Sequence, residues 1–243
     1  MYFNSQFSEK YNLHNALLYG VLLKIYMGIE CLHTYHHLMS GVQSMKLLHK
    51  DNLYCWSEFD EDRNIDFHSY LWIRAEGNVV FDPLLLTSHD EEHLMSLGSV
   101  THIVISNSDH IRDAKRLAEI TGAQIWGPSE EASNFPIKCT KWLVEETSVL
   151  EGLDVYSLNG SKTNGELSFL IEGETLITGD LVRSHSGGKL CMLPEVKLLD
   201  IEEAKNSVKR LASIQGVKAI LPGDGWPVFR DGGQVLSELA KSI

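Results

Sequence analysis

Apolar and polar positions along the chain predict strands and helices in alternation. Two apolar runs, 70–74 and 79–81, flank a Glu-Gly-Asn turn signal and together predict a β-hairpin. The run 100–105 is apolar almost throughout, which predicts a buried strand. After it, apolar residues recur at the spacing of an amphipathic helix over 109–120, and Gly122 is the expected end of that helix.

The second half of the chain repeats this order of elements. Asp200 and Glu203 form a capping box that predicts a helix over 200–214. Further strands are expected at 123–126, 153–158, 166–171, 175–178 and 217–221, and further helices at 90–97 and 231–239. Two β-rich halves, each finished by helices, predict an α/β fold of the α+β kind, a four-layer αββα sandwich.

Residues 1–44 differ from the rest and contain a helix candidate over 14–38. The regular pattern starts at Met45, which suggests the hypothesis that Met45 is the true start of the protein. We therefore expect an N-terminal extension over 1–44 and one domain over 45–243.

Composition limits the classes of partner. The formal net charge is −12, which disfavours phosphate backbones and anionic lipid surfaces, so neither nucleic acid nor membrane is expected to bind. No apolar run reaches the roughly 18–20 residues of a spanning helix. The four cysteines lie far apart without a Cys-x-x-Cys pair, which favours reduced thiols and a cytoplasmic location. The expected partner is a small molecule, and the sequence leaves the oligomeric state open.

Several residue groups have simple structural interpretations. His33, His36 and His37 have a spacing that could bind a metal, but no carboxylate or cysteine accompanies them, so a solvated helix face is favoured. Cys55 and Cys139 are expected to be buried, unreactive thiols.

Five short motifs lie at predicted strand ends. The segment 105–110, Ile-Ser-Asn-Ser-Asp-His, is similar to the metal-binding signature His-x-His-x-Asp-His with its first two histidines replaced. The other four motifs are Val80–Asp82, Gly160–Leu167, Ile177–Asp180 and Leu221–Gly225. In this order they resemble the metallo-β-lactamase superfamily, and within it a diverged subgroup of metal-dependent hydrolases. The resemblance runs from about Leu53 to the C-terminus and implies a sandwich of that type.

The resemblance implies that the first metal site of the family is lost. That site uses the bridging aspartate, here Asp180, and three histidines, whose places are taken by Ile105, Asn107 and Ser161. Isoleucine has no donor atom, and neutral amide and hydroxyl oxygens are weak ligands for zinc.

The second implied site keeps more of its ligands. Asp109, His110 and Asp180 match the family pattern, and Asp224 stands in place of the last histidine. Such a set implies at most one divalent ion, Zn²⁺, Mn²⁺ or Fe²⁺. Carboxylates gathered in one pocket repel each other, so either a cation or raised pKa values should accompany them. Alternatively, each aspartate caps a turn or a helix, and His110 is simply hydrogen-bonded.

Two functions therefore remain open. One is slow hydrolysis of an ester, thioester or lactone, with Asp109, His110 and Asp180 as catalytic residues and one metal ion. The other is a non-catalytic, metal-free binding module that keeps the fold and the pocket. In the first case we expect Asn107, Ser161, Lys162, Arg183 and Trp226 to contact the substrate, with Trp126 also at the pocket wall.

Overall fold

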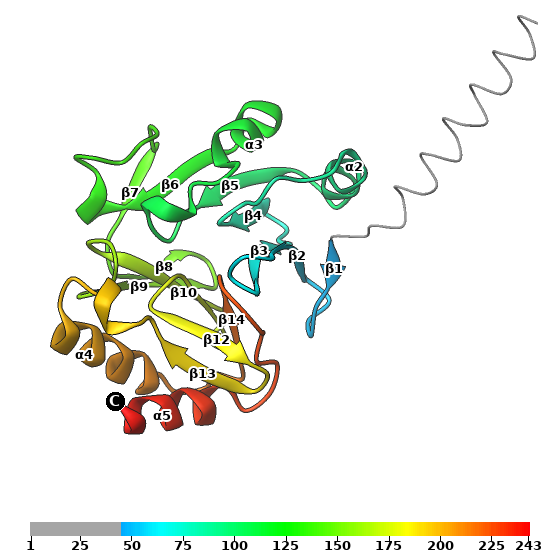
Figure 1. The fold of residues 1–243 in the computed structure, drawn as a ribbon. Helices are drawn as coiled ribbons and strands as arrows, with labels where there is room; N and C mark the ends of the chain where they lie inside the picture. The colour runs from blue at the N-terminus through cyan, green and yellow to red at the C-terminus, as the bar shows by residue number, and fades with distance from the viewer. Residues whose placement is uncertain (1–44) are drawn as a thin grey trace, which may run out of the picture. The chain divides into compact units, whose positions relative to one another are not determined.

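Two β-sheets packed face to face form the centre of the described part of the chain, residues 45–243 of a computed structural model. Helices α2 (Ser88–Ser96) and α3 (Ala114–Thr121) lie against the outer face of one sheet, and α4 (Ile201–Ala212) and α5 (Gly232–Ser242) against the other (Figure 1). This arrangement confirms the predicted αββα sandwich.

The larger sheet has seven strands in sequence order, antiparallel from β1 to β4 and parallel from β4 to β7. Its strands are β1 (Lys46–Leu47), β2 (Leu53–Asp60), β3 (Ile65–Trp72), β4 (Asn78–Phe81), β5 (Val100–Val104), β6 (Gln124–Pro128) and β7 (Lys141–Leu143). Short 3₁₀ helices follow β5 and β6, at Ser108–His110 and Ser129–Glu131.

The smaller sheet has five strands in the order β14-β11-β10-β9-β8, in which β11 and β14 are the parallel pair. Its strands are β8 (Glu146–Leu150), β9 (Leu153–Leu158), β10 (Glu166–Ile171), β11 (Thr175–Thr178) and β14 (Ala219–Pro222). A separate two-stranded ribbon consists of β12 (Val182–Ser186) and β13 (Lys189–Met192), and a 3₁₀ helix follows it at Glu195–Lys197.

Alternation along the strands divides the core into layers, because successive side chains point to opposite faces of a sheet. In β4, Phe81 faces the layer between the sheets, where its ring packs 5.3 Å from that of Phe169 on β10. Its neighbour Val80 faces the layer under α2 and α3. On the other side, Leu176 and Ile220 pack against α4 and α5. The sheets are thereby held together by one apolar layer that ends at the strand termini.

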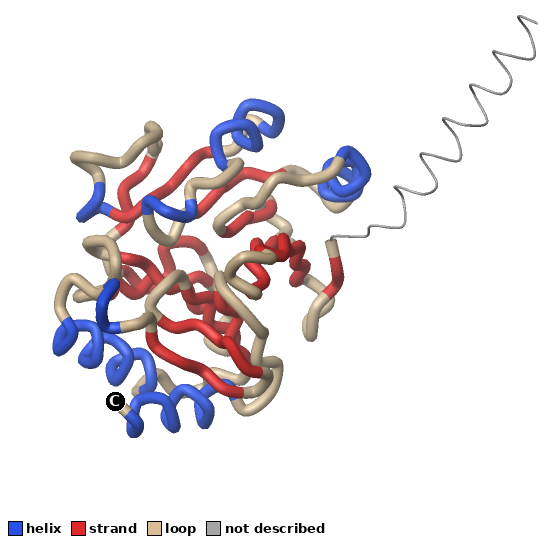
Figure 2. The backbone as a smooth tube through the Cα atoms, viewed as in Figure 1, coloured by secondary structure: helices blue, strands red, loops and turns tan. Residues whose placement is uncertain are grey.

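The structure differs from the sequence-based expectation in several elements. Figure 2 shows where the helices, strands and loops of the structure lie. The helix predicted over 109–120 is interrupted, because Arg112 has a positive φ of 45° and α3 begins only at Ala114. Strands β12 and β13 were not predicted, because their sequences alternate weakly and carry polar residues. The helix expected at 14–38 and the histidines at 33, 36 and 37 lie outside the described residues. Within residues 45–243, no helix is long and apolar enough to cross a membrane.

Candidate metal centre

Polar side chains gather where four strands end. Asp82 follows β4 and His110 follows β5, while Asp180 follows β11 and Asp224 follows β14. Each pair of strands is parallel, so their carboxyl ends lie at the same edge of their sheet. The two sheets therefore bring four residues, far apart in the sequence, to one edge of the sandwich.

His110 is held by a buried carboxylate behind it. Its Nδ1 lies 2.9 Å from Asp82 Oδ2 and 2.9 Å from the Ser106 hydroxyl. The Ser106 backbone N–H and hydroxyl both donate to Asp82. With Nδ1 engaged by Asp82, Nε2 is the nitrogen left for a ligand, which is the arrangement that orients metal-binding histidines. Nε2 lies 3.7 Å from Asp180 Oδ2.

These contacts shift the pKa values of His110 and Asp82. Burial lowers the pKa of His110, but Asp82 and Asp180 raise it more, so the net shift is upward. Burial raises the pKa of Asp82, but His110, Arg112 and the Ser106 hydroxyl lower it further, so the net shift is downward. These shifts favour the ionised form of Asp82 and the protonated form of the His110 imidazole.

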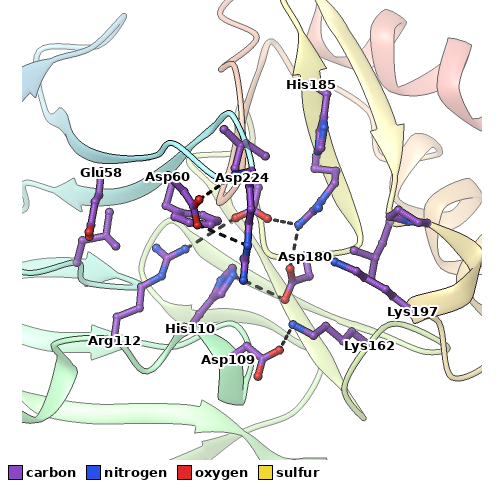
Figure 3. A pocket seen from close by; sticks show the side chains of 17 residues that line it. Glu58, Asp60, Asp109, His110, Arg112, Lys162, Asp180, His185, Lys197 and Asp224 are labelled. Carbon is purple, nitrogen blue, oxygen red and sulfur yellow. Dashed lines mark hydrogen bonds and ion pairs between the residues drawn. The ribbon is translucent and has the colours of Figure 1, made fainter.

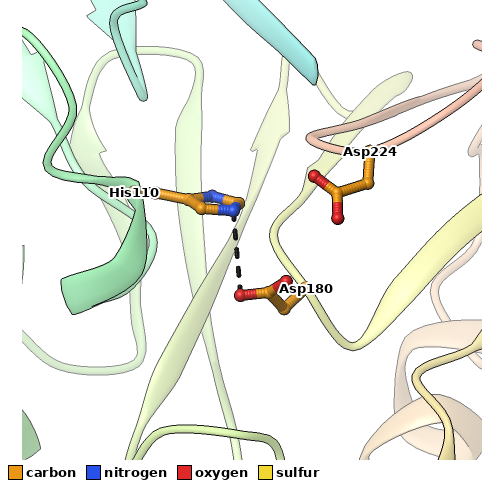
Figure 4. A group of neighbouring side chains, drawn as sticks. All are labelled: His110, Asp180 and Asp224. Carbon is orange, nitrogen blue, oxygen red and sulfur yellow. Dashed lines mark ion pairs between the residues drawn. The ribbon is translucent and has the colours of Figure 1, made fainter. Parts of the chain in front are cut away.

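Three groups converge on one point. His110, Asp180 and Asp224 each offer one ligand atom, and these atoms lie within 4.8 Å of one another (Figure 4). All three side chains are buried. Gly223 permits this approach, because a Cβ atom at that position would lie 2.9 Å from Cε1 of His110. The cluster therefore depends on glycine before Asp224 as well as on its three donors.

Two guanidinium groups lie against the same carboxylates. Nη2 of Arg183 is 3.1 Å from Asp180 Oδ1 and also contacts Asp224 Oδ2. Nη2 of Arg112 is 3.9 Å from Asp224 Oδ1, while its Nη1 donates to the backbone oxygens of His68 and Asp82. The cluster thus contains its own positive charges.

A fourth acidic group fills the space beside Ser161, one of the positions of the expected first site. Glu166, at the start of β10, is fully buried, hydrogen-bonded to the Ser161 hydroxyl, and accepts the backbone N–H of Leu181 at 2.9 Å. Burial, with the Asp180 carboxylate nearby, raises the pKa of Glu166 to about 8. A Cβ at Gly179 would lie 2.9 Å from Glu166 Oε1 and 3.1 Å from Asn107 Nδ2. The chain's own hydrogen bonds therefore occupy this space.

The cluster forms one wall of a cavity of about 630 Å³ (Figure 3). Six of the residues singled out in the sequence line it: Asp109, His110, Lys162, Asp180, Arg183 and Asp224. Other charged residues in its lining are Glu58, Asp60, Arg63, Arg112 and Lys197. Its volume suits a small molecule.

The other predicted residues are not among the three donors of the cluster. The Asp109 carboxylate is 43% exposed and forms an ion pair with Lys162, so the structure does not bring it to the three-donor cluster. Asn107 is buried and donates to Asp180 Oδ2 at 3.3 Å, and Ser161 is buried against Glu166. Trp226 is 59% exposed and does not line the cavity.

Sequence reasoning did not assign site roles to Asp82, Glu166 and Arg112. Glu166 could have been recognised as a carboxylate at the head of a mostly apolar strand, since such a group is seldom buried without a specific partner. Asp82 could have been recognised because it is an acidic residue directly after the apolar strand β4. Arg112 carried no comparable signal, because its position follows from the break before α3.

Comparisons with known proteins agree with this fold. The family model described as the metallo-beta-lactamase superfamily matches residues 45–243. No curated protein matches the sequence significantly. Among solved structures, a metallo-beta-lactamase from Pontibacter korlensis has a TM-score of 0.65 at 14% identity, over 82% of this chain and 99% of that one. The mono-zinc form of FIM-1 from Pseudomonas aeruginosa has a TM-score of 0.65 at 12% identity, over 82% and 95%. DIM-1 metallo-beta-lactamase has a TM-score of 0.64 at 13% identity, over 82% and 98%.

Proposed function

Because the chain belongs to the metallo-beta-lactamase superfamily, we propose that it is a metal-dependent hydrolase with a single metal site. His110, Asp180 and Asp224 would hold the ion. The observation that carries this proposal is the convergence of these three donors within 4.8 Å at the wall of a cavity. The FIM-1 structure carries one zinc by its own description, so one-metal occupancy has a precedent in this fold.

The donor set fits one divalent ion. Oδ1 of Asp224 is buried and has no hydrogen-bond partner among the described residues, which is unusual for a carboxylate oxygen and suits a ligand atom. One imidazole and two carboxylates favour Mn²⁺ or Fe²⁺ and also accept Zn²⁺. When bound, such an ion supplies Lewis acidity and a nucleophile at neutral pH.

The surrounding residues have separable tasks in this proposal. Asp82 keeps Nε2 of His110 directed at the cluster, and Asn107 orients Asp180 by its 3.3 Å hydrogen bond. Arg112 and Arg183 provide positive charge next to the reacting group, where negative charge develops during attack on a carbonyl. The substrate we propose is a small ester, thioester or lactone. Ser161, at a position of the expected first site, is engaged with Glu166, so two-metal chemistry is not proposed.

A second candidate is a metal-free binding module. The observation that favours it is Arg183, whose guanidinium already contacts both Asp180 and Asp224. In that case the cavity binds a ligand without transforming it.

Metal content and hydrolysis test the first candidate together. Full-length protein purified without chelators is titrated with Mn²⁺ and Zn²⁺ by calorimetry and assayed on esters, thioesters and lactones. We expect one ion per chain and metal-dependent turnover. Asp82→Asn, which keeps the three donors, should weaken metal affinity or activity about 10- to 100-fold. The exposed Asp62→Asn is the matched control and should leave both unchanged. Absence of bound metal under all conditions would favour the second candidate.

A further inference from the structure

Arg112 has a backbone conformation that arginine rarely adopts. Its φ is 45°, in the left-handed region, where residues with a bulky side chain are uncommon. It lies between the 3₁₀ helix Ser108–His110 and α3. Asp82, which follows β4, is left-handed as well, with a φ of 48°. Such residues persist only where the surrounding structure holds them, and they cluster at sites that bind ligands.

The guanidinium of Arg112 is fixed by contacts with two strands. Nη1 donates to the backbone oxygen of His68 at 2.6 Å and to that of Asp82 at 3.0 Å. The guanidinium also lies over the ring of Phe67, with Cζ 5.7 Å from the ring centroid. The side chain is 12% exposed. These contacts use the planar fork of arginine, which a lysine ammonium does not reproduce.

The fixed guanidinium faces Asp224. Its Nη2 lies 3.9 Å from Oδ1 of this carboxylate, and Figure 3 shows the Arg112 side chain extending toward it. This separation suits an ion pair and is too long for a hydrogen bond. Oδ1 is buried and has no hydrogen-bond partner among residues 45–243. Arg112 therefore attracts the carboxylate and leaves the lone pairs of Oδ1 free for a ligand.

Backbone pairing sets the distance between Arg112 and the turn that contains Asp224. The N–H of His68 donates to the backbone oxygen of Gly223 at 2.8 Å. The preceding residue, Phe67, forms an antiparallel bridge with Asp224 itself. The strand residues that hold the guanidinium are thus the ones paired with this turn. Arg112 connects an acidic donor of the five-stranded sheet to the end of the seven-stranded one.

An acidic donor at position 224 has a particular need for this contact. The family resemblance places a histidine there, and a neutral imidazole brings no charge to the site. Asp224 adds a second buried carboxylate beside Asp180, and buried like charges are costly unless a cation compensates them. Arg183 contacts Oδ2 of Asp224, so Arg112 provides the positive charge on the side of Oδ1.

We propose that Arg112 is a positioning residue of the metal centre, which holds Asp224 in the orientation that binds the ion. The inference rests on the proposed function for its metal site. It adds that the choice of aspartate at position 224 and of arginine at position 112 belong together. The effect of Arg112 on metal affinity should therefore depend on which residue stands at position 224.

The test measures Zn²⁺ affinity of the full chain by calorimetry, after bound metal has been removed with a chelator. Zn²⁺ is suitable because it accepts both carboxylate and imidazole ligands. Arg112→Lys keeps the positive charge and loses the fork, so it should weaken Zn²⁺ binding about tenfold, within the range for residues that orient metal ligands. Arg116→Lys is the matched control, because Arg116 on α3 contacts Glu91 and Asp113, and it should bind Zn²⁺ as the wild type does.

A double-mutant cycle separates positioning from a structural role. Asp224→His places an imidazole at the site, and in that background Arg112→Lys should change Zn²⁺ affinity less than about twofold. Urea denaturation measures the structural part separately. Loss of the bonds to His68 and Asp82 should lower the stability of Arg112→Lys equally in both backgrounds. Asp224→Asn and Arg112→Gln form a second cycle, which keeps the comparison intact where a variant of the first cycle fails to fold.

The outcomes distinguish this inference from the proposed function. An equal loss of Zn²⁺ affinity on Arg112→Lys in both backgrounds overturns the inference, makes Arg112 a structural residue and leaves the metal site in place. Affinity that is unchanged or tighter in Arg112→Lys alone overturns it as well. A wild-type chain that binds no Zn²⁺ removes the proposed metal site and the inference together.

Discussion

Glu166 contacts Ser161, one of the positions that the resemblance assigns to the first metal site of the family. Its carboxyl group is fully buried between Ser161 and the backbone of Leu181, close to Asn107. The resemblance puts Ser161 at one of the three histidine positions, and its hydroxyl donates to Glu166 without a cation.

This buried acid makes stability depend on pH in a defined direction. Its pKa is about 8 when folded, against 4.5 for an unperturbed glutamate. Below pH 4.5 the folded and the unfolded chain both keep the proton, so the full stability is present. As pH rises from 4.5 to about 8, only the unfolded chain releases the proton, and the contribution of Glu166 to the free energy of unfolding declines.

Glu166→Gln removes this titration and preserves the shape of the side chain. The variant should equal the wild type in stability near pH 4 and become more stable as pH rises, with a difference of about 1.4 kcal/mol per unit of pKa shift. Urea denaturation from pH 4 to 9 measures it. The exposed Glu151→Gln is the control and should follow the wild type throughout. A constant difference between Glu166→Gln and wild type across this range would contradict the buried protonated acid.

At the scale of elements, the site is made by strand ends and the turns after them. The apolar runs that predict β4, β5, β11 and β14 are strong, because these strands are buried on both faces. The turn after β5 was harder to predict. A periodic pattern over 109–120 favours one helix, yet the positive φ of Arg112 interrupts it and directs that guanidinium toward Asp82 and Asp224. Local periodicity does not contain such tertiary contacts.

The turn after β14 offers a test at this scale. Gly223→Ala places a methyl group 2.9 Å from His110 Cε1, so either the imidazole or the turn must shift, and the arrangement of the three donors changes. Mn²⁺ affinity should fall at least about tenfold, with a loss of stability of about 1–3 kcal/mol from overpacking. Gly187→Ala adds the same methyl group in open space on the β12–β13 turn. That control should bind Mn²⁺ as the wild type does, and equal binding by Gly223→Ala would show that His110 is not a ligand.

At the scale of the whole molecule, the order of motifs predicted the fold. The site was predicted less well, because the sequence does not show which charged side chains form ion pairs with one another. The sandwich follows from two β-rich halves with helices. Three of the four predicted metal ligands converge, because each follows a buried strand at the same edge. Asp109 does not converge with them. It precedes His110 in the same 3₁₀ helix, so its side chain points in a different direction and pairs with Lys162. Which cation pairs with which carboxylate depends on contacts between the sheets, which no sequence pattern contains.

The donors also come from both sheets, which links metal binding to global stability. His110 belongs to the seven-stranded sheet, and Asp180 and Asp224 belong to the five-stranded one. Mn²⁺ at a hundredfold excess over its Kd should raise the free energy of unfolding by about 2.7 kcal/mol. Urea denaturation with and without Mn²⁺ measures this gain. His110→Ala should abolish it and Asp109→Asn should keep it, whereas loss of the gain in Asp109→Asn would make Asp109 a ligand after all.

The register of the β12–β13 ribbon has a practical consequence. Arg183 pairs directly with Cys191 across the two strands. Burial raises the pKa of Cys55 to about 12 and that of Cys139 to about 11, so both thiols resist alkylation. Cys191 is more accessible than either. Within residues 45–243 it is therefore the natural attachment point for a spin label, and distances from such a label would follow the arginine's strand as ligands are added.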